Sequence, residues 1–287
     1  MSQALTLQNM LSPVQPTWCP GCGNFSILTA LKQALIELDL PMEEVTLVFG
    51  IGCSGNTADF IKGHALHALH GRGLANAVGI KLANHRQKVI MIGGDGDIYG
   101  EGLNHLVAAC RGNHDITTLV FNNHRYSLTT GQTSPTSNKG TLSKSTPQGL
   151  IEDPIGALSI AVSNGAGFVA RAYAGKLKQM VEIVKAGITY EGFSLIDVQQ
   201  PCPTFNKEQD YAWYQQNVVD LPADYDASSQ GQALMELLKV DRLSLGVIYQ
   251  SPTRQAYHTE VMHLASQSLI EQFPTQIDLS EAVTEFI

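Results

Sequence analysis

The sequence has few charged residues and few cysteines, and both shortages limit what the protein can be. Only 15% of its 287 residues are charged, and acidic residues outnumber basic ones by 26 to 18, for a net charge of −8. That balance argues against a general binder of nucleic acid or of anionic membranes. Five cysteines in a chain of this length are too few for a disulfide scaffold, so metal binding or catalysis suits them better.

Long apolar runs are also missing. No stretch approaches about 18 consecutive apolar residues, so we expect no transmembrane helix. Residues 1–18 contain neither a basic segment nor a long apolar core, so they do not look like a signal peptide. Together these absences predict a cytoplasmic protein. A hydrophobic content of 44% is enough for one large domain with a continuous core.

Apolar runs alternate with helical periodicity over the first 200 residues. This predicts an α/β fold with an open, mostly parallel sheet and helices on both faces. We expect strands at 45–49, 88–94, 117–121, 168–171 and 193–198, and helices at 24–38, 60–70, 74–84, 101–111, 155–162 and 177–188. The Ser-, Thr- and Gly-rich stretch 127–149 reads as a long loop, either a lid or a partner contact.

The character of the chain changes after Cys202. We therefore expect an α/β domain over residues 1–205 and a C-terminal extension over 206–287 that packs on the domain or on a partner subunit. Within the extension the pattern predicts helices at 230–238 and 256–273 and a strand at 245–249.

Polar residues follow two neighbouring strands of the expected sheet. Gly94-Asp95-Gly96-Asp97 comes after one strand, and Asn122-Asn123 comes after the next. Paired strands lie about 4.8 Å apart, so Asp95 and Asn123 can reach one ion. Carboxylate and amide oxygens suit Mg²⁺, and glycines let backbone N–H groups approach phosphate oxygens. The sequence predicts a site for Mg²⁺ and a phosphorylated cofactor, although either motif alone is often only a turn.

The cysteines form a second candidate site. Cys19 and Cys22 have CxxC spacing, Cys53 lies in a glycine-rich turn, and Cys202 lies between two prolines, whereas Cys110 has the setting of a core residue. Four thiolates bind either Zn²⁺ or a [4Fe–4S] cluster, and the residues alone leave that choice open. His64, His67 and His70 would fan over about 120° of a helix, which does not favour a three-histidine metal site.

These motifs resemble those of a known family. GDGD followed by NN looks like the thiamine diphosphate signature, and NNHRYSLTTGQTSPTS is similar to a block of the β subunits of 2-oxoacid:ferredoxin oxidoreductases. The same family carries segments like WCPGCG at 18–23, GIGCS at 50–54 and QPCPTFN at 200–206. The chain departs from the family block at Ser127, where Gly is frequent, and at Thr130, where Gly or Lys is found.

The resemblance implies a set of ligands. Asp95, Asn123 and the Arg125 carbonyl would bind Mg²⁺, and a [4Fe–4S] cluster would take Cys19, Cys22, Cys53 and Cys202. The residues implied at the thiamine diphosphate are Gly94, Asp95, Gly96, Asp97, Asn123, Leu128, Thr129, Ser54, His70 and Arg72. The glutamate that contacts the aminopyrimidine ring is expected from a partner α subunit, since this chain offers no confident catalytic residue.

The implied reaction is oxidative decarboxylation of a 2-oxo acid with coenzyme A, giving acyl-CoA and CO₂ while electrons pass through the cluster to ferredoxin. 2-Oxoglutarate is favoured over pyruvate as the substrate. The α subunit would complete a heterodimer or an α2β2 complex and contribute to substrate and coenzyme A binding. Two alternatives remain: a non-redox thiamine diphosphate decarboxylase with structural zinc, and a metal-bound structural or redox-sensor protein without catalysis.

Overall fold

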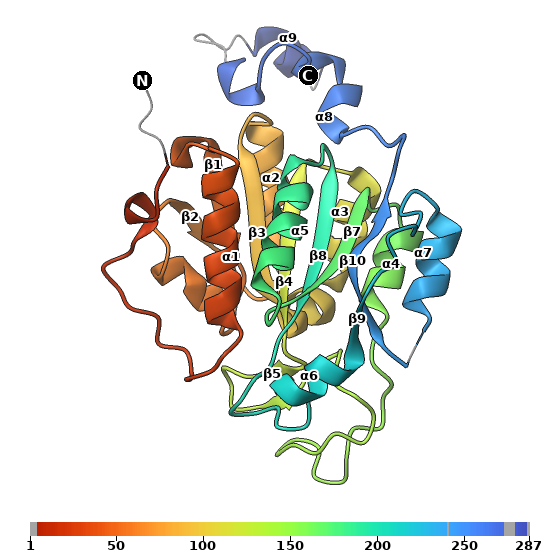
Figure 1. Cartoon of the computed structure of the whole chain (residues 1–287). Coiled ribbons are helices and arrows are strands. Elements are labelled where there is room, and N and C mark those ends of the chain that lie inside the picture. Colours follow the sequence, from red (N-terminus) through yellow and green to blue (C-terminus); the bar gives the residue numbers. More distant parts are fainter. Residues whose placement is uncertain (1–4, 240, 273–278, 286–287) are drawn as a thin grey trace.

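An eight-stranded sheet forms the centre of the protein, seen here in a computed structural model that describes residues 5–239, 241–272 and 279–285. Its order is β2-β1-β3-β4-β8-β7-β10-β9, and every neighbouring pair is parallel except β7 with β10 (Figure 1). The fold class expected from the sequence is therefore confirmed. The strands are β1 Val45–Phe49, β2 His64–His67, β3 Lys88–Gly94, β4 Ile116–Asn122, β7 Phe168–Tyr173, β8 Phe193–Gln199, β9 Val218–Asp220 and β10 Leu243–Gln250.

Helices cover both faces of this sheet. Buried residues of α1 and α5 pack on one face, and those of α2, α3, α4 and α7 pack on the other (Figure 1). Neighbouring residues of one strand alternate between the two layers, as in β4, where Leu119 and Phe121 join the first layer and Val120 joins the second. The longer helices are α1 Asn24–Glu37, α2 Gly73–Ala83, α3 Leu103–Gly112, α4 Ala157–Ser163, α5 Leu177–Thr189, α6 Tyr211–Asn217 and α7 Gln230–Leu237.

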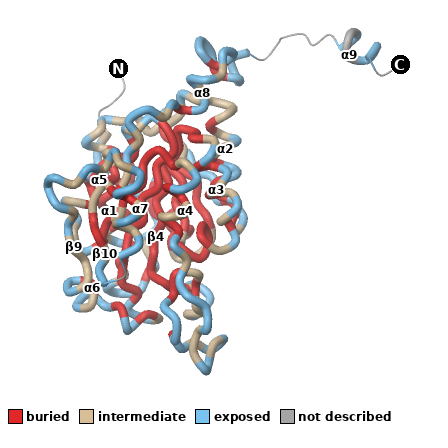
Figure 2. The backbone as a smooth tube through the Cα atoms, turned by 90° about the vertical axis from the view of Figure 1, so that its right-hand side faces the viewer, coloured by how far each residue is buried: buried red, intermediate tan, exposed pale blue. Residues whose placement is uncertain are grey.

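The central strands are the most deeply buried part of the molecule. All seven residues of β4 and of β8 are buried, and Figure 2 shows the buried backbone concentrated in the middle of the sheet. A strand buried on both faces needs a nearly continuous apolar run, which is why β4 and β8 could be located from the sequence. These two strands and β3 run side by side in parallel, so their carboxyl ends open at one edge.

The expected helix at 60–70 is wrong. This segment forms β2, a parallel edge strand in which His64 pairs with Thr46 and His67 pairs with Phe49. The preceding turn, η3, spans Gly55–Asp59. Gly63 would lie inside the expected helix, where glycine costs about 1 kcal/mol relative to alanine. The segment pairs with β1 as a strand instead. His64, His67 and His70 are therefore not spread around a helix as expected.

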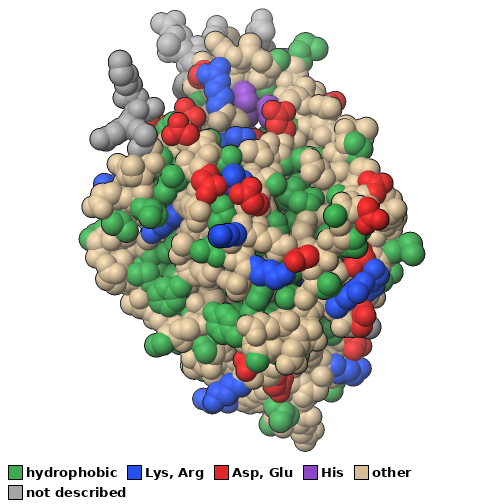
Figure 3. All heavy atoms as spheres, in the orientation of Figure 1, with side chains coloured by type: hydrophobic (Ala, Val, Ile, Leu, Met, Phe, Trp, Pro, Cys, Tyr) green, Lys and Arg blue, Asp and Glu red, His purple; other side chains and the backbone are tan. Residues whose placement is uncertain are grey.

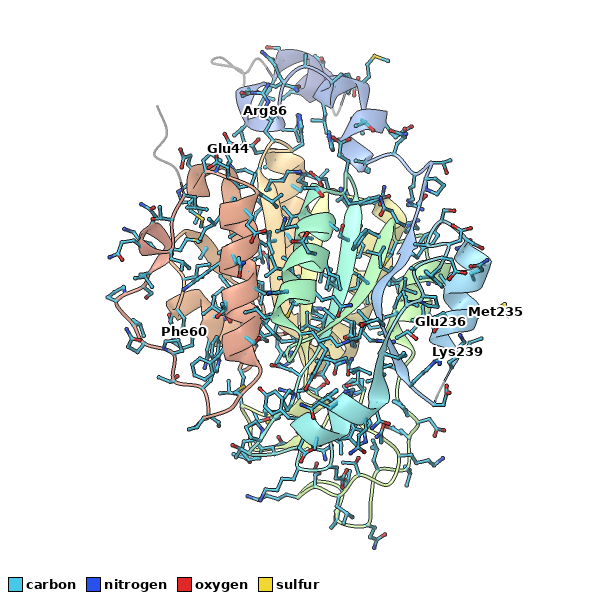
Figure 4. All side chains as sticks on the ribbon, in the orientation of Figure 1. Glu44, Phe60, Arg86, Met235, Glu236 and Lys239 are labelled. Carbon is cyan, nitrogen blue, oxygen red and sulfur yellow. The ribbon has the colours of Figure 1, made fainter. Side chains whose placement is uncertain are left out.

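The C-terminal segment joins the sheet through β9 and β10. The long helix expected at 256–273 is wrong over its described residues, which form the short helix α8 Tyr257–Glu260 and the 3-10 turns η5 Met262–Leu264 and η6 Leu269–Glu271; residue 273 lies outside the described part. Ser268 begins η6 as its N-cap, and its backbone N–H donates to the Glu271 side chain at 3.0 Å. Arg86 pairs with Glu271 at 2.6 Å and ties this segment to the domain (Figure 4).

The division of the chain at residue 205 stays a prediction. Within the described residues, no helix combines the length and the apolar character needed to cross a bilayer. On the face shown in Figure 3, acidic and basic side chains are interspersed among neutral ones.

We expect Leu119→Ala in β4 to lower the free energy of unfolding by about 2–5 kcal/mol. Leu119 has no exposed surface, and the cavity that the truncation leaves would lie between packed layers. Urea denaturation would measure the change. Leu142→Ala is the matched control, since Leu142 is 63% exposed and its truncation is expected to change stability by less than about 0.5 kcal/mol. Equal effects of the two substitutions would contradict the assignment of β4 to the core.

Candidate functional site

Asp95 and Asn123 meet at the carboxyl edge of the sheet. Asp95 follows β3 and Asn123 follows β4, and these strands pair in parallel up to Gly94 opposite Phe121. Both side chains line one pocket of about 70 Å³. The same pocket is lined by the predicted residues Ser54, His70, Gly94, Gly96, Asp97, Arg125, Leu128 and Thr129. The structure thus gathers most of the predicted cofactor residues in one place.

Arg72 is the exception. It does not line this pocket, and its exposed guanidinium lies 2.9 Å from the Nε2 atom of His105. Nothing in the described contacts therefore supports the expectation that Arg72 lies close to the cofactor, whereas its neighbour His70 does line the pocket.

Asp95 is held by hydroxyl groups that sequence reasoning missed. Its Oδ2 atom accepts hydrogen bonds from Ser134 Oγ at 2.5 Å and from Thr136 Oγ1 at 2.6 Å. No hydrogen bond reaches its Oδ1 atom from the described part of the chain. Burial raises the pKa of Asp95, while the His124 charge and the two hydroxyl donors oppose that rise. An adjacent cation would favour the ionised carboxylate, so this environment fits a metal ligand.

Ser134 and Thr136 belong to the stretch that we expected to be a lid or a partner contact. Ser134, Thr136 and Ser137 are instead buried beneath the carboxyl edge of the sheet. The only sequence signal for them was the high density of hydroxyl residues close after Asn123. Periodicity cannot detect such a segment, because its backbone is irregular except for the two-residue strands β5 Arg125–Tyr126 and β6 Gln132–Thr133.

Asn123 and Arg125 form a tight turn at the end of β4. The Asn123 Oδ1 atom accepts the Arg125 backbone N–H at 3.0 Å, and His124 between them has a φ of 60°. The Arg125 guanidinium donates to the Phe205 carbonyl at 3.2 Å and to Ser137 Oγ at 3.3 Å. The side chain of Arg125 is therefore engaged elsewhere, as expected if its carbonyl rather than its guanidinium contributes to a metal site.

Asp97 fixes the glycine-rich turn after β1. Its Oδ1 atom accepts the Gly71 N–H at 2.8 Å and the Ile51 N–H at 3.3 Å, and it lies 3.2 Å from His70 Nδ1. A Cβ atom at Gly50 would lie 1.8 Å from the Asp97 Oδ2 atom, so no side chain fits there. Burial raises the pKa of Asp97, and the Gly71 and Ile51 N–H groups oppose that rise.

Several buried polar atoms at this pocket have no protein partner. The Ser54 hydroxyl, the Asp97 Oδ2 atom and both amide atoms of Gln200 make no hydrogen bond within the described part of the chain. Ser54, Asp97 and Gln200 all line the pocket. An unpaired buried polar group costs about 1–3 kcal/mol, so unpartnered polar groups on residues of one pocket are consistent with a polar ligand there. A diphosphate with its metal ion fits this set of donors and acceptors.

Four cysteines line a second cavity of about 240 Å³. They are Cys19 and Cys22 before α1, Cys53 after β1 and Cys202 after β8, and all are free thiols. Burial raises the pKa of Cys22 to about 12 and that of Cys53 to about 11, and the charges of the other thiolates add to both shifts. The sulfurs are therefore close enough to interact. Cys110 is buried in α3, away from this cavity, as expected.

The thiols surround a space and do not converge on one ion. No group of three or more His, Cys, Asp or Glu side chains among the described residues is arranged to hold a metal ion. Four thiols that line one cavity are a donor set that either Zn²⁺ or an iron–sulfur cluster could take.

Direct contacts hold the cysteine segments together. The Trp18 indole donates to the Cys53 carbonyl at 2.7 Å, and the Gly23 N–H donates to the Pro201 carbonyl at 3.4 Å. Asn206 joins the two sites, because its backbone N–H donates to the Cys202 carbonyl and its side-chain amide donates to the Asn123 carbonyl at 3.0 Å. Trp18 and Asn206 were missed as supporting residues, since sequence position alone does not reveal such long-range contacts.

The two cavities share a wall. Cys53, Asn123, Ser127 and Leu128 line both the pocket at Asp95 and the cavity between the thiols. A group held by the thiols would therefore sit next to a group bound at Asp95 and Asn123. This adjacency is the main functional feature of the site.

A third cavity, of about 270 Å³, lies on the other side of Asn122 and His124. Its wall includes an ion pair of Arg171 with Asp197, 3.7 Å apart, and Asp197 also accepts hydrogen bonds from Tyr99 and Asn122. Asn122 thus faces this internal network while Asn123 faces the pocket. The charges of Arg171 and Asp197 compensate each other, so this cavity has no evident preference for an ion.

Comparisons with known proteins agree with this arrangement. Residues 50–198 match the family model of the thiamine pyrophosphate enzyme C-terminal TPP-binding domain, and residues 202–266 match the model of the C-terminal region of the pyruvate ferredoxin oxidoreductase beta subunit. The 2-oxoacid:ferredoxin oxidoreductase subunit beta of Saccharolobus solfataricus is 41% identical over 275 residues, which cover 91% of this chain and 88% of the relative.

Two further relatives carry names that mention 2-oxoglutarate. The 2-oxoglutarate oxidoreductase subunit KorB of Mycobacterium tuberculosis is 39% identical, over 69% of this chain and 53% of that one. A solved structure, 2-oxoglutarate:ferredoxin oxidoreductase from Magnetococcus marinus with 2-oxoglutarate, coenzyme A and succinyl-CoA bound, superposes with a TM-score of 0.88 at 32% identity, covering 97% of this chain and 94% of that chain. By sequence, by fold and by the residues gathered at its site, this chain belongs to the family of 2-oxoacid:ferredoxin oxidoreductase β subunits.

Proposed function

We propose that this chain is the cofactor-carrying subunit of a 2-oxoglutarate:ferredoxin oxidoreductase. In this proposal it binds thiamine diphosphate through Mg²⁺ and holds a [4Fe–4S] cluster, and the enzyme is completed by an α subunit. The reaction is oxidative decarboxylation of the 2-oxo acid with coenzyme A, giving acyl-CoA and CO₂, with electrons leaving to ferredoxin. The observation that carries the proposal is the shared wall of the cofactor pocket and the four-thiol cavity.

Thiamine diphosphate and the [4Fe–4S] cluster have different roles in the proposed reaction. Bound thiamine diphosphate supplies the electron sink that a 2-oxo acid needs when it loses CO₂, and a [4Fe–4S] cluster takes up electrons singly. The chain's own residues position both groups. Asp95, Asn123 and the Arg125 carbonyl hold the metal ion, while Ser134 and Thr136 orient the Asp95 carboxylate by occupying its Oδ2 atom.

The lining of the pocket supports a contribution from a partner. Its acidic residues are Asp95 and Asp97, and no glutamate is among the described residues that line it. Glu101 lies outside the pocket, where its carboxylate contacts His70 and Tyr126 at 3.2 Å. We therefore assign the acid that faces the aminopyrimidine ring to the α subunit. The α subunit would also cover the apolar side chains exposed near this edge, Leu128, Leu142 and Ile151.

Two observations bear on the substrate. The relatives named KorB and the Magnetococcus marinus structure with bound 2-oxoglutarate favour 2-oxoglutarate. The match of residues 202–266 to the C-terminal region of the pyruvate ferredoxin oxidoreductase beta subunit makes pyruvate the second candidate. The co-purified complex should be assayed with a panel of 2-oxo acids, coenzyme A and a viologen dye. A kcat/KM higher for pyruvate than for 2-oxoglutarate would reverse the order of the candidates.

The electron carrier, the stoichiometry and the cytoplasmic location stay predictions. We propose a ferredoxin as the carrier and a heterodimer or an α2β2 complex as the assembly. The runner-up function is a non-redox thiamine diphosphate decarboxylase with structural zinc, which predicts a colourless protein that contains zinc and turns over without a dye.

We expect Asp95→Asn to abolish Mg²⁺-dependent thiamine diphosphate binding, because it removes the charged metal ligand. Thr136→Val should weaken that binding by roughly 10- to 100-fold, the usual cost of losing an outer-sphere partner of a metal ligand. Isothermal titration of thiamine diphosphate with Mg²⁺ into the cofactor-depleted complex would measure both effects. Thr141→Val is the matched control, since Thr141 is buried in the same loop and its hydroxyl makes no contact with Asp95. Unchanged binding by the Thr136 variant would contradict the assigned role of that hydroxyl.

The anaerobically purified complex should be brown and contain about four iron and four sulfide per cluster-binding site in the β chain. Alanine at Cys19, Cys22, Cys53 or Cys202 should lower the iron content and the visible absorption of that cluster, because each removes a thiolate ligand. Cys110→Ala is the control and should keep both, since Cys110 packs in α3. Zinc without iron in the wild-type chain, or iron loss equal in the control, would rule out the proposed cluster ligands.

A further inference from the structure

One side-chain hydroxyl contacts a sulfur of the four-thiol cavity. The Ser127 Oγ atom lies 3.3 Å from the Cys202 Sγ atom, and both residues are buried, with 8% and 6% of their surface exposed. Across the described part of the chain, no other side-chain hydroxyl lies within hydrogen-bonding distance of these four sulfurs, and the Ser127 hydroxyl makes no other hydrogen bond. The contact joins residues 75 positions apart, so only the fold creates it.

Both ends of this contact are held in place. On the Ser127 side, the Thr130 N–H donates to the Ser127 carbonyl at 3.1 Å, and the Gly131 N–H donates to the Tyr126 carbonyl at 3.0 Å. On the Cys202 side, the Asn206 N–H donates to the Cys202 carbonyl at 2.9 Å. The backbone on both sides of the contact is therefore held by closed turns.

Thr130 has an unusual backbone conformation in the turn that follows Ser127. Its φ of 79° is unusual for a β-branched residue, and Gly131 follows with a φ of 99°. A side chain at Gly131 would collide with Phe205, whose Cδ1 atom would lie 2.8 Å from the new Cβ atom. The turn that carries Ser127 is thus pressed against the segment that carries Cys202.

The direction of the hydrogen bond follows from metal chemistry. A cysteine bound to iron is a thiolate and has no proton to donate. The Ser127 hydroxyl must then be the donor and the Cys202 sulfur the acceptor. A hydrogen bond to an ionised acceptor is also stronger than one between neutral groups, so cluster binding reinforces the contact.

We propose that Ser127 raises the reduction potential of the cluster by donating a hydrogen bond to Cys202. A reduced cluster carries one more negative charge than the oxidised one, and a donor at a ligand sulfur stabilises that charge. Ser127 also belongs to the wall shared by the thiol cavity and the cofactor pocket. Its hydroxyl therefore acts on the side of the cluster that faces the thiamine diphosphate pocket, from which the electrons come. This role rests on the proposed function, because it requires the cluster.

The test compares Ser127→Ala with Ser127→Thr in the intact complex with the α subunit. Alanine removes the donor, whereas threonine keeps a hydroxyl at the same position. Ser163→Ala is the matched control, since Ser163 is an exposed residue of α4 that lines neither cavity. Each protein is titrated anaerobically with redox dyes, and the reduced β-chain cluster is followed by its electron paramagnetic resonance signal.

In the Ser127→Ala variant, we expect the ratio of reduced to oxidised cluster at a fixed potential to fall about threefold. That change corresponds to a midpoint about 30 mV lower, at 59 mV per tenfold for a one-electron couple. The threonine and Ser163 variants should titrate as the wild type does. A midpoint unchanged in the alanine variant, or an equal shift in the threonine variant, would overturn the proposal.

A second measurement distinguishes loss of the hydrogen bond from a purely structural effect of the substitution. After exchange into D₂O, pulsed electron–nuclear spectra of the reduced wild type should lose a proton coupling, and the alanine variant should lack that coupling before exchange. The same spectra should be unaltered by the Ser163 substitution.

Loss of iron from the alanine variant would mean that Ser127 holds the ligand in place, which contradicts a tuning role. A wild-type complex without iron in the β chain would instead defeat the proposed function itself, and this inference with it.

Discussion

The parallel pairing of β1, β3, β4 and β8 is the constraint on which the site depends. Parallel neighbours place all their carboxyl ends at one edge, so the turns that follow these four strands must crowd together there. The turn after β1 carries Cys53, the turns after β3 and β4 carry Asp95 and Asn123, and the turn after β8 carries Cys202. The parallel pairing therefore brings together the proposed metal ligands Asp95 and Asn123 and two of the four thiols that line the second cavity. Only Cys19 and Cys22 reach the site by another route, from the segment before α1.

At this edge carboxylates and polar side chains are buried close together, and only some of them have hydrogen-bond partners in the protein. Burial raises the pKa values of Asp95 and Asp97, and the hydroxyl and N–H groups around them oppose this rise. Ser54 and Gln200 remain without protein partners among the described residues. Such an unsatisfied set is costly in the isolated chain and becomes favourable when a cation and a phosphorylated ligand supply the missing charges and hydrogen bonds. The thiols show the same effect, since burial and the neighbouring thiolates raise the pKa values of Cys22 and Cys53.

The errors made from the sequence have a common origin. The segment at 60–70 has helical spacing, yet β2 forms because the free edge of β1 offers a full ladder of hydrogen bonds. The segment at 256–273 shows helical periodicity, yet its described residues form only the short helix α8 and two 3-10 turns, the second of which Ser268 caps. The loop expected to be a lid or a partner contact is partly buried, and two of its hydroxyl groups donate to Asp95. In the first two segments the helical period did not decide the structure, and the loop has no period to read.

The sequence alone predicted the type of fold, which the structure confirms, and it predicted residues that would hold the cofactors. Apolar runs in β3, β4 and β8 located the buried strands, and short motifs after them marked Asp95, Asn123 and Cys202. Motifs before α1 and after β1 marked Cys19, Cys22 and Cys53. Local patterns suffice for these features because burial and turn chemistry leave direct traces in composition. Only the tertiary structure decided that Ser134 and Thr136 hold Asp95, that Arg72 lies outside the pocket, and that Ser127 meets Cys202. Those relations join segments up to 75 residues apart, and their geometry comes from how irregular turns pack at the edge of the sheet, which no periodicity records.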